Sequence, residues 1–119
     1  MVVVVSDFLD ASNWARELRG VTMRHETIAV EVVDPRELEI PDVGLMTFVD
    51  PETGRRRRFD TADAPARARY QAAARRQRRD IGARIAGAGA AHLTLRTDQD
   101  WVADIVRFAA AQRQKVAAK

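Results

Sequence analysis

The chain has no cysteine among its 119 residues, which excludes a disulfide framework, a thiolate metal site and a cysteine nucleophile. Aromatic residues make up only 6% of it and much of its apolar content is alanine, so we expect a thin core. It lacks the run of about 18 apolar residues that a membrane span needs. Its first residues lack the basic leader and small-residue cleavage site of a secretory signal. These absences predict a soluble, cytoplasmic protein of one small domain.

Charge is divided unevenly along the chain. Residues 1–54 hold 4 Arg and 11 Asp or Glu, a net charge of −7, whereas residues 55–92 hold 11 Arg and 3 Asp, a net charge of +8. An arginine-rich segment can bind nucleic acid or an acidic protein. A solvated surface is the commoner cause of such a composition, so we rank an acidic protein partner second and nucleic acid third.

The first strand places polar residues where α/β proteins bind ligands. Val2 to Val5 form a continuous β-branched run, which predicts a strand buried on both faces, as in the middle of a parallel sheet. Ser6 and Asp7 follow at its carboxyl end, the edge at which open α/β sheets bind ligands and metals. The simpler alternative is that Asp7 only stabilises the start of the next helix.

Hydrophobic periodicity and turn residues predict the other elements. We expect a helix from Asp10 or Ser12 to about Arg24, a strand over 27–33, an ordered loop over 35–44, a hairpin over 45–61, a helix over 64–88, a strand over 92–96, and a helix over 100–114 followed by a frayed tail over 115–119. A strand, a helix and a second strand make a βαβ unit with parallel pairing. The predicted fold class is therefore α/β, a three-layer arrangement with a mostly parallel sheet and an inserted β-hairpin.

The predicted hairpin carries the densest charge. Asp50-Pro51-Glu52-Thr53-Gly54 has the Pro and Gly of a turn, and Arg55, Arg56, Arg57 and Arg58 follow it. Successive strand residues face opposite sides, so each face of the ribbon receives two arginines and is mostly solvated. With a second cluster, Arg75-Arg76-Gln77-Arg78-Arg79, these residues are the candidate partner-binding surface. Aromatics are not interleaved with them and no glycine-rich phosphate loop precedes the helices, which weakens the nucleic-acid hypothesis.

Further residues are weighed against a structural role. Asp34 ends the second strand and could bind a partner or assist a site at Asp7, although an Asp-Pro turn explains it more simply. His25 and His92 show no metal-ligand or catalytic spacing, and we interpret both as structural or solvated. Trp14 and Trp101 lie on apolar helix faces and are predicted to be core residues with indole N–H groups near the surface. Ile105, Phe108 and Ala109 complete the predicted buried face of the last helix.

Several segments match a known family in order and spacing. They are V-S-D-F-L-D at 5–10, R-H-E-T-I-A-V-E-V-V-D-P-R-E at 24–37, L-E-I-P-D-V-G-L at 38–45, D-P-E-T-G at 50–54 and L-T-L-R-T-D-Q-D-W at 93–101. In these the chain resembles the carboxyl-terminal half of the bacterial "domain of unknown function fifty-eight" family. The resemblance implies a fold like that of a von Willebrand factor A (vWA) domain, of which residues 1–114 would be the second half.

The resemblance also implies a metal site and a class of partner. The complete domain would hold magnesium at an Asp-x-Ser-x-Ser loop, a threonine and a Ser-Asp dipeptide, and only the last is matched, by Ser6-Asp7. One carboxylate and one hydroxyl will not hold Mg²⁺ tightly, so we expect no cofactor in this chain. The family is associated with MoxR-type AAA ATPases, which implies a non-enzymatic adaptor that presents clients or helps to insert cofactors.

Three other hypotheses stay open. Asp7 and Asp34 could serve a divalent-metal-dependent phosphoryl-transfer or nuclease-like enzyme, with the arginines as phosphate clamps. The hairpin and helix arginines could bind nucleic acid. The valine strand would lack a neighbour on one side in a half-domain, and an exposed valine edge favours self-association through Val2 to Val5 or local disorder.

Overall fold

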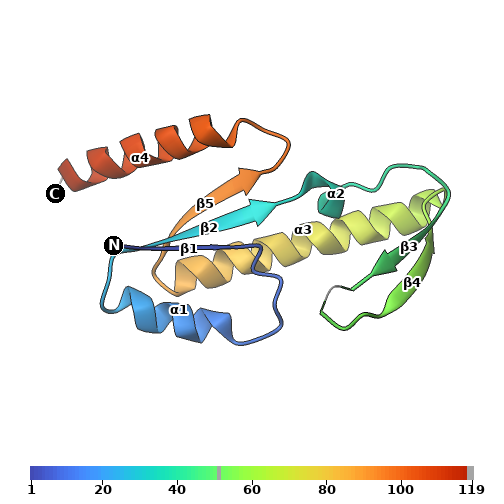
Figure 1. Ribbon diagram of the computed structural model, residues 1–119, viewed down its shortest axis with the longest axis horizontal. Coiled ribbons are helices and arrows are strands. Elements are labelled where there is room, and N and C mark those ends of the chain that lie inside the picture. The colour runs from blue at the N-terminus through green and yellow to red at the C-terminus, as the bar shows by residue number, and fades with distance from the viewer. Residues whose placement is uncertain (51, 118–119) are drawn as a thin grey trace. The chain divides into compact units, whose positions relative to one another are not determined.

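A computed structural model describes residues 1–50 and 52–117 of the chain as a mixed α/β fold (Figure 1). The elements in chain order are β1 (Val2–Ser6), α1 (Trp14–Thr22), β2 (Thr27–Val33), α2 (Pro35–Leu38), β3 (Leu45–Val49), β4 (Arg56–Asp60), α3 (Ala64–Gly87), β5 (Ala91–Arg96) and α4 (Trp101–Ala117). The chain divides into two compact units. The first, here the sheet unit, comprises Met1–Pro35 and Arg79–Lys119, and the second, the hairpin unit, comprises Arg36–Arg78.

The sheet unit contains a parallel sheet in the order β1-β2-β5, which confirms the predicted fold class. Val2 to Ser6 pair with Thr27 to Glu31, and Ile28 to Val33 pair with Ala91 to Arg96. All three strands therefore end at the same edge of the sheet. The βαβ unit formed by β1, α1 and β2 is also confirmed, since its two strands are parallel neighbours.

One face of this sheet carries the core. Phe8, Leu18 of α1, Ala29 of β2, and Ile81, Ile85 and Ala88 at the end of α3 form one buried cluster. Leu18 of α1 and Ile81 of α3 pack on the sheet. Both lie on the apolar faces that the three- and four-residue spacing of hydrophobic residues predicts for these helices. Helix α4 lies on the other side of the sheet and contacts β5 (Figure 1), so the sheet unit has three layers.

The prediction that β1 is buried on both faces was wrong. Val2 and Val4 are half-buried, but Val3 is 51% exposed and Val5 is 63% exposed. Because successive strand side chains face opposite sides, Val3 and Val5 share one face of β1, and their exposure shows that this face is largely uncovered within the described residues. A run of valines favours a strand, but it cannot tell how many neighbouring layers are present.

The predicted burial of the α4 face was also wrong in part. Trp101 is 54% exposed, and Ile105 and Ala109 are exposed, while Phe108 is half-buried. The apolar stripe exists, but most of its side chains are exposed in the described residues. Helix α4 also continues to Ala117, three residues beyond its predicted end at Gln114. The rest of the predicted frayed tail, residues 118–119, lies outside the described residues.

Trp14 is in the core, but its indole N–H is not near the surface. Its ring packs on Phe8 with a centroid distance of 4.9 Å, and the guanidinium carbon of Arg84 lies 4.3 Å from the ring centroid. The Nε1 atom is buried without a hydrogen-bond partner in the described part of the chain. The cation over the indole face offsets part of the cost of burying that donor.

The hairpin unit is built on antiparallel β3 and β4, whose register pairs Leu45 with Asp60 and Val49 with Arg56. The predicted turn is confirmed at Gly54, whose φ of 71° suits glycine, whereas Pro51 lies outside the described residues. Phe48, Phe59 and Tyr70 of α3 form a triangle with ring centroids 6.0 to 6.2 Å apart. The aromatic side chains thereby hold one face of the ribbon on the helix.

Two smaller features complete the fold. Residues 35–38 form the short helix α2 where a loop was predicted, because Pro35 is well suited to a first helical position. None of the helices within the described ranges has the length and apolar content that a membrane-spanning segment requires.

Candidate functional site

The loop after β1 is held in a defined conformation. The backbone N–H of Phe8 donates to Ser6 Oγ at 3.0 Å, and the N–H of Leu9 donates to Asp7 Oδ1 at 3.0 Å. Phe8 has a φ of 57°, a left-handed conformation that is rare for a bulky residue, and its ring is buried in the core. The buried ring anchors the loop while Asp7 remains exposed at the carboxyl edge of the sheet.

Asp34 lies at the same edge, because β1 and β2 are parallel neighbours and it directly follows β2. Asp34 is half-buried, and the structure places it and Asp7 beyond the ends of adjacent strands. The described residues contain no group of three or more Asp, Glu, His or Cys that could hold a metal ion. Ser6 and Asp7 offer three side-chain oxygens, of which Ser6 Oγ and Asp7 Oδ1 already accept a backbone N–H, whereas Mg²⁺ requires six ligands in near-octahedral geometry. These two residues alone do not fit a magnesium ion.

A row of polar side chains crosses the sheet just before this edge. The register aligns Ser6 of β1 with Glu31 of β2, and Glu31 with Thr94 of β5. Glu31 is only 2% exposed, and its Oε1 lies 2.8 Å from Nε2 of His92 and 3.3 Å from Oγ1 of Thr94, which donates to it. On α3, a Cβ atom added to Gly82 would lie 3.6 Å from Cε1 of His92, so the helix backbone comes close to the imidazole. The row thus contains the buried carboxylate of Glu31, which is hydrogen-bonded and has the imidazole of His92 beside it.

The amino-acid sequence contains one signal for this row that the pattern-based predictions did not include. Glu31 is the one charged side chain inside an otherwise apolar strand interior, and such a residue needs a buried partner. His92 was interpreted as structural or solvated, and its hydrogen bonds agree with a structural role. The pairing of the two could not be identified, because they lie 61 residues apart along the chain.

The arginine hairpin is a second, separate feature. Arg55, Arg56, Arg57 and Arg58 are all exposed, as predicted. Within β4, the register places Arg57 opposite Phe48 on the aromatic face, and Arg56 and Arg58 opposite Val49 and Thr47 on the other face. The ribbon therefore has one face packed against α3 and one outer face with two arginines.

The turn of the hairpin is closed by Asp50. Its Oδ1 accepts the backbone N–H of Glu52 at 2.9 Å, and its own N–H donates to the carbonyl of Arg55 at 2.9 Å. The Glu52 N–H, followed by the Thr53 side chain, holds the pKa of the Asp50 carboxyl below its usual value. The ionised carboxylate thus belongs to the folded form of the turn.

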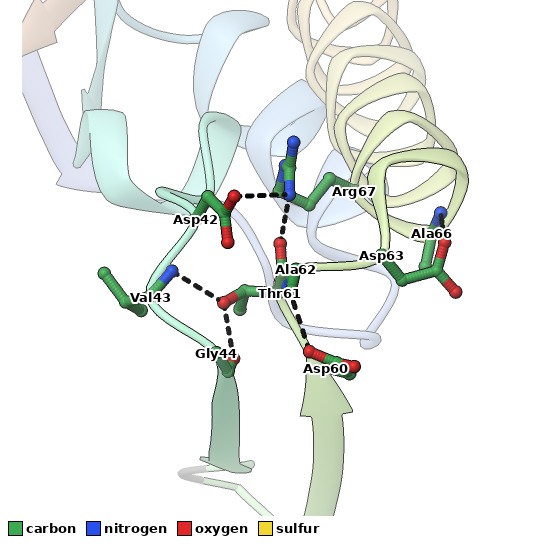
Figure 2. A network of polar contacts seen from close by, with 9 residues as sticks. All are labelled: Asp42, Val43, Gly44, Asp60, Thr61, Ala62, Asp63, Ala66 and Arg67. Carbon is green, nitrogen blue, oxygen red and sulfur yellow. Dashed lines mark hydrogen bonds and ion pairs between the residues drawn. The ribbon is translucent and has the colours of Figure 1, made fainter.

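A polar network fixes the other end of the hairpin (Figure 2). Thr61 is fully buried; its Oγ1 accepts the N–H of Val43 at 2.9 Å and donates to the carbonyl of Gly44. Arg67 of α3 donates to the carbonyl of Thr61, and its Nη1 lies 3.7 Å from a carboxylate oxygen of Asp42. The side chain of Thr61 thus joins the adjacent ends of β3 and β4, and the side chain of Arg67 joins them to α3.

Comparison with known proteins identifies relatives but no function. A family model described as "Protein of unknown function DUF58" matches residues 1–80. The uncharacterized protein MAV169 of Mycobacterium avium is 48% identical over 114 residues, which cover 96% of this chain and 67% of that protein. The uncharacterized proteins Mb1516 of Mycobacterium bovis and Rv1480 of Mycobacterium tuberculosis are each 48% identical over 96% of this chain. The chain spans only 36% of the length of each of these two. No solved structure matches it significantly.

Proposed function

This chain belongs to the DUF58 family, and on that premise we propose that it is part of a vWA-like, non-enzymatic adaptor that works with a MoxR-type AAA ATPase. The proposal assigns the chain no catalytic step of its own. It assigns a binding surface to the carboxyl edge of the sheet around Ser6, Asp7 and Asp34. A second surface is assigned to the arginine hairpin.

The observation that carries the proposal is the conformation of the loop after β1. Two backbone N–H groups donate to the Ser6 and Asp7 side chains. The ring of Phe8 is buried in the core and holds the backbone of the same residue in its left-handed conformation. Such a strained conformation persists only where the surrounding structure maintains it, and it is commonest at functional sites. It presents an exposed carboxylate at the edge where open α/β sheets bind their ligands.

The vWA likeness rests on the Ser6-Asp7 dipeptide after a valine-rich strand and on the family resemblance. If the longer family proteins do hold Mg²⁺, Asp7 and Ser6 would supply two of its ligands, and the remainder would come from residues outside this chain. A partner carboxylate that completes such a metal site is one way in which an adaptor of this kind could bind.

The test is a binding titration against a purified MoxR-type AAA ATPase encoded in the same genome. We expect Asp7→Asn to weaken the binding about tenfold, as the loss of one charge-assisted contact does. Asp10→Asn is the matched control, because Asp10 lies in the same exposed loop and accepts the N–H of Ser12 in the same type of turn. It should change the affinity by less than about twofold.

The titration is repeated with the longer relative from Mycobacterium tuberculosis. Binding by that protein but not by this chain would assign the contact to the part that this chain does not match. If neither protein binds the ATPase, or if both variants bind as well as the wild type, the proposed role of the Asp7 edge is wrong.

A further inference from the structure

The outer face of the β3–β4 ribbon combines arginines with exposed apolar side chains. Because paired residues share a face, Leu45, Thr47 and Val49 of β3 lie beside Asp60, Arg58 and Arg56 of β4. Leu45 is 62% exposed and Val49 is 56% exposed. A solvated ribbon would normally carry polar side chains at these β3 positions, so the face has the composition of an interface.

The two arginines on this face are available to a partner. Neither Arg56 nor Arg58 forms an ion pair or a side-chain hydrogen bond with any residue that the structure describes. Arg56 and Arg58 are separated by one residue, so their side chains leave the backbone of the strand about 6.8 Å apart. The carboxylate of Asp60, at the far end of the row, accepts the backbone N–H of Ala62 at 3.0 Å.

The backbone of the ribbon is also held at both ends, so little backbone entropy is lost when a ligand binds the face. Asp50 closes the turn at one end and buried Thr61 joins the strands at the other. The opposite face packs Phe48 and Phe59 on Tyr70. A preorganised surface with a fixed register can select a ligand by the spacing of its side chains.

From this arrangement we propose that the outer face of the ribbon binds an extended acidic segment of a partner protein, in which alternate residues are carboxylate or apolar. In an extended segment, residues two apart share a face at the same spacing as Arg56 and Arg58. Two such carboxylates pair with the guanidinium groups, and apolar side chains on the same face cover Leu45 and Val49. The inference rests on the proposed adaptor function and specifies the chemistry of one partner.

Nucleic acid is a less suitable ligand for this face. Phosphates would satisfy the arginines but would leave Leu45 and Val49 exposed. Bases would need aromatic side chains on which to stack, whereas Phe48 and Phe59 are on the opposite face, against Tyr70. The apolar residues beside the arginines therefore favour a protein segment.

The probe is a synthetic peptide in which Leu, Glu, Glu and Leu are separated by single Ser residues, so that all four side chains share one face when the peptide is extended and the two Glu residues are two apart, as Arg56 and Arg58 are. A scrambled peptide has the same composition but places its two Glu residues next to each other. Binding of each to the full 119-residue chain is measured by calorimetry at low salt, where exposed charges are screened least. A single-stranded oligonucleotide of the same net charge is the third probe.

Three substitutions that each remove one arginine charge separate geometry from net charge. We expect Arg56→Gln and Arg58→Gln each to weaken binding of the alternating peptide about tenfold. Arg57→Gln is the matched control, because Arg57 is equally charged and exposed but lies on the aromatic face. It should weaken binding less than about twofold. Leu45→Thr and Val49→Thr, which keep the β-propensity, should each weaken it severalfold.

Four results would overturn the inference. They are no binding of the alternating peptide, equal binding of the scrambled peptide, an equal loss of affinity in Arg57→Gln, or binding of the oligonucleotide alone. None of these results bears on the ATPase titration at Asp7, so failure of the peptide-binding face and failure of the adaptor function are distinguishable. Circular dichroism of each variant checks that the chain is folded.

Discussion

Nε2 of His92 lies 2.8 Å from Oε1 of Glu31, a carboxylate whose side chain is almost completely buried in the central strand of the sheet. A buried carboxylate costs several kcal/mol unless hydrogen bonds compensate it. The contact joins β2 to β5, which are neighbours in the sheet but are separated in the chain by α2, the hairpin and α3. The stability of the sheet unit should therefore depend on this pair.

Replacing His92 with alanine should lower the free energy of unfolding by about 1–3 kcal/mol, because it removes a partner of a buried acceptor. His25→Ala is the control, since the side chain of His25 is exposed; it should change stability by less than about 0.5 kcal/mol. Chemical denaturation followed by circular dichroism measures both. In a double-mutant cycle with Glu31→Gln, the two effects should not be additive, and additivity would contradict a direct interaction.

The left-handed conformation of Phe8 predicts an unusual order of stabilities. Phe8→Ala removes a buried ring and should cost about 3–5 kcal/mol. Phe8→Gly should cost about 1 kcal/mol less than Phe8→Ala, because glycine adopts a φ of 57° without strain. The same two substitutions at Leu18, inside α1, should show the reverse order, with glycine worse than alanine by about 1 kcal/mol. If alanine were also the better replacement at position 8, the strained loop would not exist in solution.

The lowered pKa of Asp50 predicts a pH dependence of the hairpin turn. Because the Glu52 N–H and the Thr53 side chain favour the ionised carboxylate, Asp50 stabilises the turn above its unfolded pKa of about 3.9. That contribution is lost as the pH falls through the lower pKa of the folded form. NMR titration of the Asp50 carboxyl carbon measures this pKa directly.

Thr53→Ala should move the Asp50 pKa part of the way back towards its ordinary value, since it removes one of the two main causes of the shift. Asp50→Asn should remove the pH dependence of the turn over this range altogether. A titration midpoint at or above the ordinary aspartate value in the wild type would show that these hydrogen bonds do not form.

The exposed valines of β1 predict self-association. β1 is an edge strand in the described sheet, and edge strands with apolar side chains pair readily with other chains. Val5→Lys should shift the chain towards monomer in light scattering, because a charged side chain on an edge strand opposes pairing. Val43→Lys is the control, since Val43 is as exposed as Val5 but lies in the hairpin unit. A monomeric wild type with slow amide exchange at Val2 to Val5 would contradict the prediction.

Local patterns allowed much of the fold to be predicted. The β-branched strands over 27–33 and 45–49 and the turn at Gly54 are where the sequence places them, because short-range chemistry determines them. The exposure of Val3 and Trp101 was not predictable, because an apolar stripe is the same whether or not another element covers it. The division into two compact units was missed for a related reason, since α3 is one continuous helix that contributes to both.

The candidate site was predictable only where it lies in a continuous segment. Ser6 and Asp7 follow directly from the end of a strand, and the structure places them there. The pairing of Glu31 with His92 depends on the order and register of three strands, neither of which a single sequence specifies. The outer face of the ribbon could be predicted only in part. Alternation alone predicts two arginines on each face, but the packing of Phe48 on Tyr70 decides which face is covered.

The hydroxyl of Thr61 has a consequence for the arginine surface. Because its Oγ1 accepts the N–H of Val43 and donates to the carbonyl of Gly44, β4 cannot slip by one residue against β3 without breaking both hydrogen bonds. Such a slip would turn every side chain of the strand over. It would bring Arg57 outward and drive Arg56 and Arg58 against the aromatic rings. A single uncharged side chain at the base of the hairpin thus determines which arginines its outer surface displays.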